Sequence, residues 1–182
     1  MIRETTTENG AVRGIPAADP RITAFKGIPF AAPPAKENRW RAPGPAENWE
    51  GVLDCARFGK AAMQPVPGLS DNVYTREWHV DPEIPMGEDC LQLNIWTPAK
   101  TVKDRLPVFV FLFGGGLQCG YPSEMEFDGE RIARRGIVVV TANYRVGVFG
   151  FLALPELTKE APDSPTNFGL FDQQAALRWV RR

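Results

Sequence analysis

Histidine and serine are nearly absent from this sequence of 182 residues. The only histidine is His79, and the serines are Ser70, Ser123 and Ser164. One histidine offers at most one imidazole base for proton transfer. None of the serines stands in the G-x-S-x-G setting of a nucleophile elbow, where a sharp strand-to-helix turn needs small residues on both sides. We therefore interpret all three serines as loop residues, and His79 as a loop histidine exposed to solvent.

Cysteine is also scarce, with only Cys55, Cys90 and Cys119. An odd, sparse set without metal-ligand spacing argues against a disulfide framework and against a zinc site. We expect no metal and no cofactor. The first residues are polar and contain no apolar core of a signal peptide, so the expected location is the cytoplasm.

Long apolar runs are missing as well, and none could span a bilayer. The formal net charge is -1, which gives no reason to expect nucleic acid or a membrane surface as a partner. The hydrophobic fraction of 43% is nevertheless sufficient for a buried core. A length of 182 residues fits a single domain.

The first part of the chain, up to about residue 66, reads as short strands broken by turns. Residues 21–25 alternate as a half-buried strand does. The prolines in residues 27–34 remove backbone donors, so we expect no regular element there. Residues 67–87 are polar and interrupted by glycine and proline, which predicts a long surface loop.

The second half has the pattern of an α/β protein. Residues 91–96 form a strand candidate, and 108–113 and 137–141 are apolar on both faces. The charged segment 124–135 between these two runs is compatible with a helix, which predicts a parallel βαβ unit.

Residues 170–182 predict a final helix. Leu177 and Val180 fall near Leu170 on one apolar stripe, with Ala176 beside them. Asp172 would be a favourable charge in the first turn rather than a catalytic acid.

Three glycines, Gly114, Gly115 and Gly116, follow the apolar run 108–113. Consecutive backbone N–H groups without side chains can converge on an anion or a developing oxyanion. The same residues could simply form a turn that ends a strand, and their spacing leaves both interpretations open. A dinucleotide site is disfavoured, because residues 114–120 do not give G-x-G-x-x-G.

Other residues could carry chemistry but have simpler interpretations. Cys119 could be a reactive thiol with His79 as its base, although nothing in the sequence brings them together. Glu88 and Asp89 could be an acid–base pair, yet a structural acid with a cationic partner is the simpler role. The basic cluster is interpreted as a solvated helix face; it comprises Arg131, Arg134 and Arg135.

Several strings together, in this order, resemble the type-B carboxylesterase and cholinesterase family. They are Phe25-Lys26-Gly27-Ile28-Pro29-Phe30-Ala31, Pro33-Pro34 with Arg39-Trp40, Glu88-Asp89-Cys90-Leu91-Gln92-Leu93-Asn94-Ile95-Trp96, Phe113-Gly114-Gly115-Gly116, Asn143-Tyr144-Arg145-Val146-Gly147-Val148-Phe149-Gly150-Phe151 and Asn167-Phe168-Gly169-Leu170-Phe171-Asp172-Gln173-Gln174. The resemblance implies the α/β-hydrolase fold, with a mixed, mostly parallel sheet and flanking helices. It also implies hydrolysis of a small-molecule ester by a serine enzyme.

The resemblance assigns roles to individual residues. The backbone N–H groups of Gly115 and Gly116 would be donors of the oxyanion hole. Glu88 would form an ion pair with Arg39. Cys90 would be half of a disulfide.

This sequence departs from the family at three places. The expected disulfide partner position is Ala62, so Cys90 should be a free thiol. Phe113 stands where the family often has His or Tyr, which removes a polar contact but not the backbone donors. The third departure is the absence of the nucleophile, acid and base, which the family places after the segment that resembles 167–174.

Residues 1–182 therefore read as the N-terminal part of one α/β-hydrolase domain, incomplete and inactive alone. We expect the C-terminal part of the hydrolase as a second chain. The alternative is a non-catalytic, cholinesterase-like interaction protein or an inactive truncated fragment.

Overall fold

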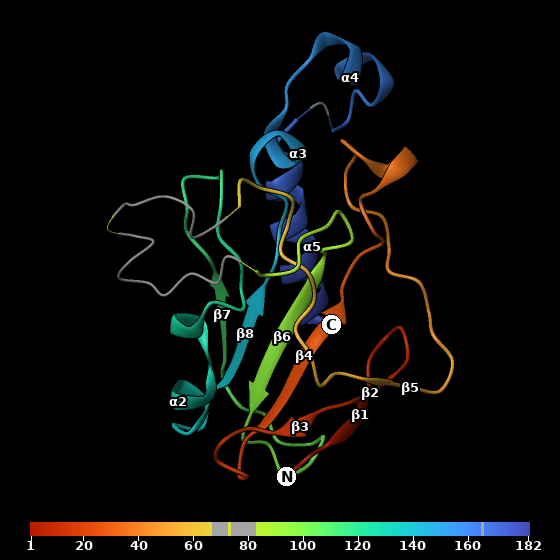
Figure 1. Cartoon of the computed structure of the whole chain (residues 1–182). Coiled ribbons are helices and arrows are strands. Elements are labelled where there is room, and N and C mark those ends of the chain that lie inside the picture. Colours follow the sequence, from red (N-terminus) through yellow and green to blue (C-terminus); the bar gives the residue numbers. More distant parts are fainter. Residues whose placement is uncertain (67–72, 74–82, 165) are drawn as a thin grey trace.

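The computed structural model describes all residues except 67–72, 74–82 and 165 (Figure 1). Its centre is a five-stranded sheet with the strand order β3-β4-β6-β8-β7. These strands are β3 (Ile15–Pro16), β4 (Thr23–Pro29), β6 (Gln92–Thr97), β8 (Val138–Ala142) and β7 (Val108–Leu112). A three-stranded sheet has the order β1-β2-β5 and consists of β1 (Glu4–Thr6), β2 (Ala11–Arg13) and β5 (Val52–Asp54).

The central sheet is mixed. β7 and β8 pair in parallel, with Val108 opposite Val138 and Leu112 opposite Ala142, which confirms the predicted βαβ unit. The pairs β3–β4, β4–β6 and β6–β8 are antiparallel. In this part of the protein, the parallel character predicted for the sheet is therefore limited to β7 and β8.

Strand β4 continues further than predicted, through Gly27 to Pro29. Its register with β6 shifts between Phe25 and Ile28, and Gly27 has a φ of 75° within this irregularity. The N–H of Gly27 donates to Oδ1 of Asn94 (2.9 Å). The expectation that residues 27–34 hold no regular element is wrong for 27–29, because a β-bulge and a side chain from β6 satisfy the backbone there.

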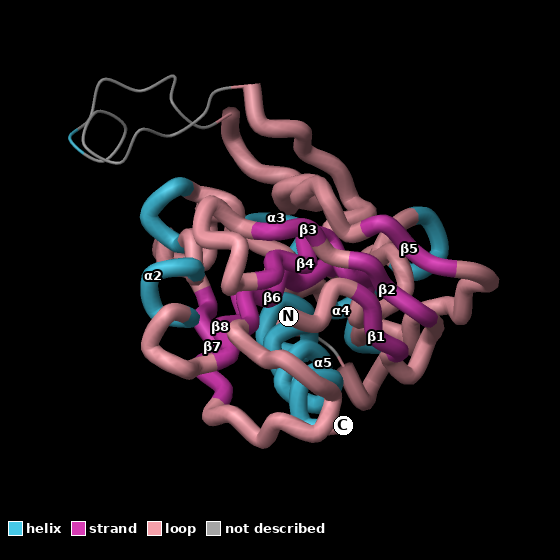
Figure 2. The backbone as a smooth tube through the Cα atoms, turned by 90° about the horizontal axis from the view of Figure 1, so that it is seen from below, coloured by secondary structure: helices cyan, strands magenta, loops and turns pink. Residues whose placement is uncertain are grey.

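Helices cover both faces of the central sheet. Figure 2 shows α5 (Phe168–Arg181) and α2 (Glu130–Ala133) on opposite sides of the strands. Because side chains alternate along a strand, Val140 of β8 packs in the same core as Ala176 of α5, while Val139 packs with Ala133 of α2. Other helical segments are η1 (Lys36–Asn38), α3 (Gly147–Phe151) and α4 (Pro155–Glu160).

The helix predicted over 124–135 is shorter and broken. A 3₁₀ turn, η2 (Met125–Phe127), precedes the single helical turn of α2, and Gly129 lies between them. A Cβ at Gly129 would lie 2.7 Å from Val139 Cγ1 and 2.8 Å from Trp96 Cε3. The glycine thus allows the chain to approach the sheet closely. The close approach occurs at the break between η2 and α2, where the sequence predicts a continuous helix.

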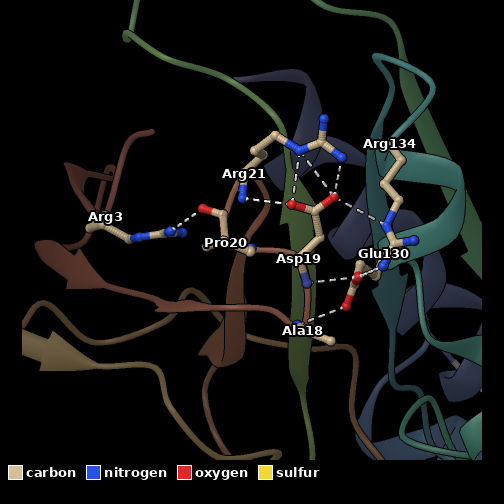
Figure 3. A network of polar contacts seen from close by, with 7 residues as sticks. All are labelled: Arg3, Ala18, Asp19, Pro20, Arg21, Glu130 and Arg134. Atoms are coloured by element: carbon tan, nitrogen blue, oxygen red, sulfur yellow. Dashed lines mark hydrogen bonds and ion pairs between the residues drawn. The ribbon is translucent and has the colours of Figure 1, made fainter.

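A polar network joins α2 to the turn between β3 and β4 (Figure 3). The Glu130 carboxylate accepts hydrogen bonds from the N–H groups of Ala18 (2.9 Å) and Asp19 (3.0 Å), and it also contacts Arg134. Arg134 forms an ion pair with Asp19 (3.5 Å) as well. Hydrogen bonds from Arg21 lower the pKa of Asp19 to about 2. Arg131, Arg134 and Arg135 are exposed, as predicted for a solvated face, and Arg134 in addition connects two segments.

Helix α5 buries a different stripe from the predicted one. Phe168, Asp172 and Ala176, spaced four residues apart, are fully buried, whereas Leu170 and Leu177 are 41% and 46% exposed. The helix begins at Phe168, so Asp172 lies beyond its first turn. The apolar stripe predicted through Leu170 and Leu177 is therefore not the face that the helix buries, and the interpretation of Asp172 as a first-turn charge is wrong.

Asp172 instead forms a buried ion pair with Arg145, which follows β8. Oδ2 of Asp172 accepts from Arg145 Nε (2.8 Å) and from its backbone N–H (3.0 Å), and Oδ1 accepts from a terminal guanidinium nitrogen (2.7 Å). The side chains are 3% and 0% exposed. The same terminal nitrogen also donates to the carbonyl of Arg41 (2.8 Å). The pair ties α5 to the end of β8.

We expect Asp172→Ala to lower the free energy of unfolding by about 3–5 kcal/mol, because it leaves the Arg145 guanidinium buried without a counter-charge. Urea unfolding followed by circular dichroism measures the change. Arg178→Ala, on the exposed side of the same helix, is the control and should stay within about 0.5 kcal/mol of the wild type. A loss below about 1 kcal/mol for Asp172→Ala would contradict the assigned role of the pair.

Strand β7 is an edge strand among the described residues, and its start is exposed. Val108 is 51% and Phe109 is 45% exposed, and no lysine or proline interrupts β7. An apolar edge of this kind is a template for pairing with another chain. We therefore expect residues 1–182 alone to self-associate or to bind a second polypeptide along β7.

Sedimentation velocity tests this expectation, and Phe109→Lys should shift the chain toward the monomer by placing a charge at the edge. Arg178→Lys serves as a surface control without effect. A monodisperse wild-type chain with strong amide protection across 108–113 would overturn the prediction.

Candidate functional site

The glycine loop, residues 113–120, begins where β7 ends. Three successive residues in it have positive φ values: 131° at Gly115, 62° at Gly116 and 63° at Leu117. Because β7 and β8 are parallel, their carboxyl ends meet at one edge of the sheet. This edge therefore brings the glycine loop beside residues 143–147, which follow β8.

Two groups that follow β8 hold the glycine loop. The Tyr144 hydroxyl donates to the carbonyl of Phe113 (2.6 Å), and the two rings stack with centroids 4.2 Å apart. Burial raises the pKa of Tyr144, so the hydroxyl stays a donor at neutral pH. The N–H of Gly147 donates to the carbonyl of Leu117 (2.7 Å). Phe113 thus replaces a polar side chain with ring stacking, and its carbonyl remains fixed.

The loop leaves several backbone donors without an acceptor among the described residues, including two adjacent ones at Gly115 and Gly116. The Gly115 carbonyl accepts from the N–H groups of Gln118 (3.1 Å) and Cys119 (3.3 Å), which closes a tight turn. The N–H groups of Gly115 and Gly116 donate to no residue that the structure describes, and both glycines are exposed. A Cβ at Gly115 would lie 2.0 Å from the Cys119 carbonyl oxygen, so this turn requires glycine. Adjacent unpaired backbone donors can hold an anionic oxygen.

The Glu88–Arg39 ion pair predicted by resemblance is confirmed. Two contacts of 2.6 Å join the Glu88 carboxylate to Nε and one terminal nitrogen of Arg39. The hydrogen bond from Arg39 holds the pKa of Glu88 below its usual range. Asp89 takes no part in this pair and accepts from Gln92 Nε2 (3.3 Å). The geometry favours the structural interpretation of Glu88 over an acid–base pair.

All three cysteines are free thiols, which confirms the prediction for Cys90. Cys90 and Ala62 are each 1% exposed and belong to the same core, where the family would have a disulfide. Burial raises the pKa values of Cys90 and Cys119. A thiol nucleophile at Cys119 therefore has no support from its surroundings.

The remaining candidates gain no catalytic role. His79 and Ser70 lie outside the described residues. Ser123 lies in a turn and Ser164 in a bend. Within the described part of the chain, no group of three or more His, Cys, Asp or Glu side chains could hold a metal ion. No described helix is long and apolar enough to cross a membrane.

Comparison with known proteins identifies the family. Residues 2–182 match the sequence model of the Carboxylesterase family. The chain belongs to the carboxylesterase family. It is 42% identical to fumonisin B1 esterase of Sphingopyxis macrogoltabida over 176 residues, which cover 96% of this chain and 30% of that relative. It is 40% identical to acetylcholinesterase of Bungarus fasciatus over 185 residues, covering 98% of this chain and 29% of the relative.

The para-nitrobenzyl esterase of Bacillus subtilis (strain 168) is 42% identical over 178 residues, covering 97% of this chain and 34% of the relative. Two solved structures of PNB esterase superpose with TM-scores of 0.80 and 0.83 at 38% identity, covering 98% of this chain and 34% of theirs. The fold is thus that of an α/β-hydrolase. This carboxylesterase chain spans about a third of the length of the relatives it matches.

Sequence reasoning missed Tyr144 and Arg145 as structural anchors, although it placed both in a family string. A signal was available, because residues that follow two parallel strands lie at one edge of the sheet. That rule would have placed Tyr144 beside Phe113. No comparable rule links Arg145 to Asp172. The spacing of the leucines in the helix points to a different face from the one that carries Asp172.

Proposed function

We propose that this carboxylesterase-family chain supplies the oxyanion-hole donors of a serine carboxylic-ester hydrolase. The observation that carries the proposal is the pair of unpaired backbone N–H groups at Gly115 and Gly116. They follow a parallel strand, where the α/β-hydrolase fold supplies such a donor. Because these donors are backbone groups, Phe113 does not weaken them.

In the proposed reaction, a serine outside residues 1–182 attacks the ester carbonyl and a histidine takes its proton. The carbonyl oxygen gains negative charge, and the N–H groups of Gly115 and Gly116 bind it. The tetrahedral intermediate then expels the alcohol, which the histidine protonates, and leaves an acyl-enzyme. Water releases the acid by the same steps. The chain contributes stabilisation of the oxyanion and no proton transfer.

The proposed substrate is a small-molecule carboxylic ester. The relatives are named for fumonisin B1, acetylcholine and para-nitrobenzyl esters, so the family supports the ester class rather than one ester. The proposed partner is a polypeptide that carries the G-x-S-x-G elbow, the acid and the histidine. We call the chain combined with such a polypeptide the complemented hydrolase. The C-terminal part of the para-nitrobenzyl esterase is a suitable reagent.

Residues 1–182 alone should not hydrolyse an aryl acetate above background, because an assembled triad is required for acyl transfer. The complemented hydrolase should turn over the same ester and lose activity after treatment with an organophosphate. Release of the phenol, followed by absorbance, measures both. Organophosphate-sensitive turnover by the pure chain would contradict the proposed division of roles. An assembled but inactive complex would favour the non-catalytic alternative.

Gly116→Val should reduce kcat of the complemented hydrolase by on the order of 10²–10³, because the side chain obstructs the donor and the substrate oxygen. Gly51→Val is the matched control. Both glycines have left-handed φ values, 62° and 73°, and neither has another heavy atom within 4 Å of a built Cβ. The control therefore measures the backbone strain of a branched residue, about 1–2 kcal/mol, away from the site. Equal activities of the two variants would remove Gly116 from the site.

A further inference from the structure

The side chain of Gln64 is hydrogen-bonded to Gly120, the last residue of the glycine loop. Its Oε1 accepts a hydrogen bond from the N–H of Gly120 (2.8 Å), and its Nε2 donates to the carbonyl of the same residue (3.0 Å). The Nε2 group also donates to the carbonyl of Ala62 (3.0 Å), which restrains the side chain's own torsions. A primary amide that meets both backbone groups of one residue fixes its position and its orientation.

Gly120 in turn lies against the peptide that presents the first donor. A Cβ at Gly120 would lie 2.5 Å from the Gly114 carbonyl oxygen and 2.6 Å from Phe113 Cδ2. The Gly114 carbonyl and the Gly115 N–H belong to one planar peptide unit. A movement of Gly120 toward this carbonyl would therefore tilt the Gly115 N–H.

The segment that carries Gln64 is anchored independently of the glycine loop. The Asn143 side-chain amide donates to the carbonyl of Lys60 (2.9 Å), and the N–H of Ala61 donates to the carbonyl of Pro85 (2.8 Å). Ala61 is 2% exposed and so belongs to the core. Gln64 thus extends from a fixed base, which a restraint on the loop requires.

We infer that Gln64 is a positioning residue for ester hydrolysis, because it holds Gly120 against the Gly114 peptide and so directs the Gly115 N–H. The inference rests on the proposed function of the chain. Gln64 touches no reacting atom, and it acts through a donor that is used when charge develops on the substrate oxygen. Its loss should therefore reduce kcat and leave KM nearly unchanged.

Hydrogen exchange tests the restraint without any need for activity. Gln64→Met keeps the length of the side chain and removes its three hydrogen bonds, and Gln64→Ala is a second variant that fits any packing. In residues 1–182, both should raise the exchange rates of the hydrogen-bonded amides of 118–120 by about tenfold, while those of 138–142 stay unchanged. Met63→Ala, at the exposed neighbouring residue (36% exposed), should change neither segment.

The kinetic test uses the complemented hydrolase and an aryl acetate. Both Gln64 variants should lower kcat by about tenfold and keep KM within about twofold, since small misplacements of catalytic groups cost up to about 10²-fold. Met63→Ala should match the wild type. Thermal unfolding of each variant should stay close to the wild-type midpoint, which separates positioning from loss of fold.

The outcomes distinguish this inference from the proposed function. Unchanged exchange of the amides of 118–120 would overturn the restraint by Gln64, whatever the activity. Faster exchange with unchanged kcat would overturn its role in positioning the donor. An inactive wild-type complemented hydrolase would refute the proposed function and, with it, the catalytic role of Gln64, while faster exchange would still support the restraint.

Discussion

The buried ion pair between Arg145 and Asp172 fixes the part of the molecule from which the site is built. A Cβ at Gly150 or at Gly169 would lie 2.2 Å or 2.4 Å from the Arg145 carbonyl oxygen, so α3 and α5 both pack directly onto this residue. Charges removed from water are tolerated only when they are closely paired and hydrogen-bonded. Here the Arg145–Asp172 pair fixes the position of the chain after β8. The neighbouring residue, Tyr144, donates a hydrogen bond to the glycine loop.

The glycine loop has an intrinsically flexible sequence, and tertiary hydrogen bonds hold it in one conformation. Glycine carries a large entropic cost on ordering, and residues 114–116 would be mobile as an isolated peptide. Hydrogen bonds from Tyr144, Gly147 and Gln64 fix carbonyl and N–H groups at both ends and in the middle. The groups left unpaired include the N–H groups of Gly115 and Gly116, which the proposed oxyanion hole would use. Donors that are fixed before the reaction cost no reorganisation when charge develops, which is the basis of electrostatic catalysis.

How far the sequence predicts this structure depends on the range of the interactions. The strands β7 and β8 follow from continuous apolar runs, which are local signals, and residues 91–96 form the strand candidate for β6. Family strings supplied the Arg39–Glu88 pair. The break before α2 could not be predicted, since it arises where Gly129 meets the sheet. The bulge in β4 likewise depends on Asn94 from another strand. The glycine motif located the candidate site, but its anchors are tertiary contacts.

Because Cys90 is a free thiol, hydrogen bonds and an ion pair, rather than a disulfide, hold the ends of the segment between Ala62 and Cys90. In the pattern that this chain resembles, a disulfide would join the positions of Ala62 and Cys90, and its state would follow the redox potential of the surroundings. Here the ends of that segment are held by hydrogen bonds between Ala61 and residues 85–87, with the Arg39–Glu88 pair beside them. The pKa of Glu88 is lowered, so its stabilising charge is present above its unfolded value of about 4 and is lost only in stronger acid. The contacts that hold the segment between Ala62 and Cys90 should therefore weaken with added salt or acid. They should not depend on the redox potential, because no disulfide is among them.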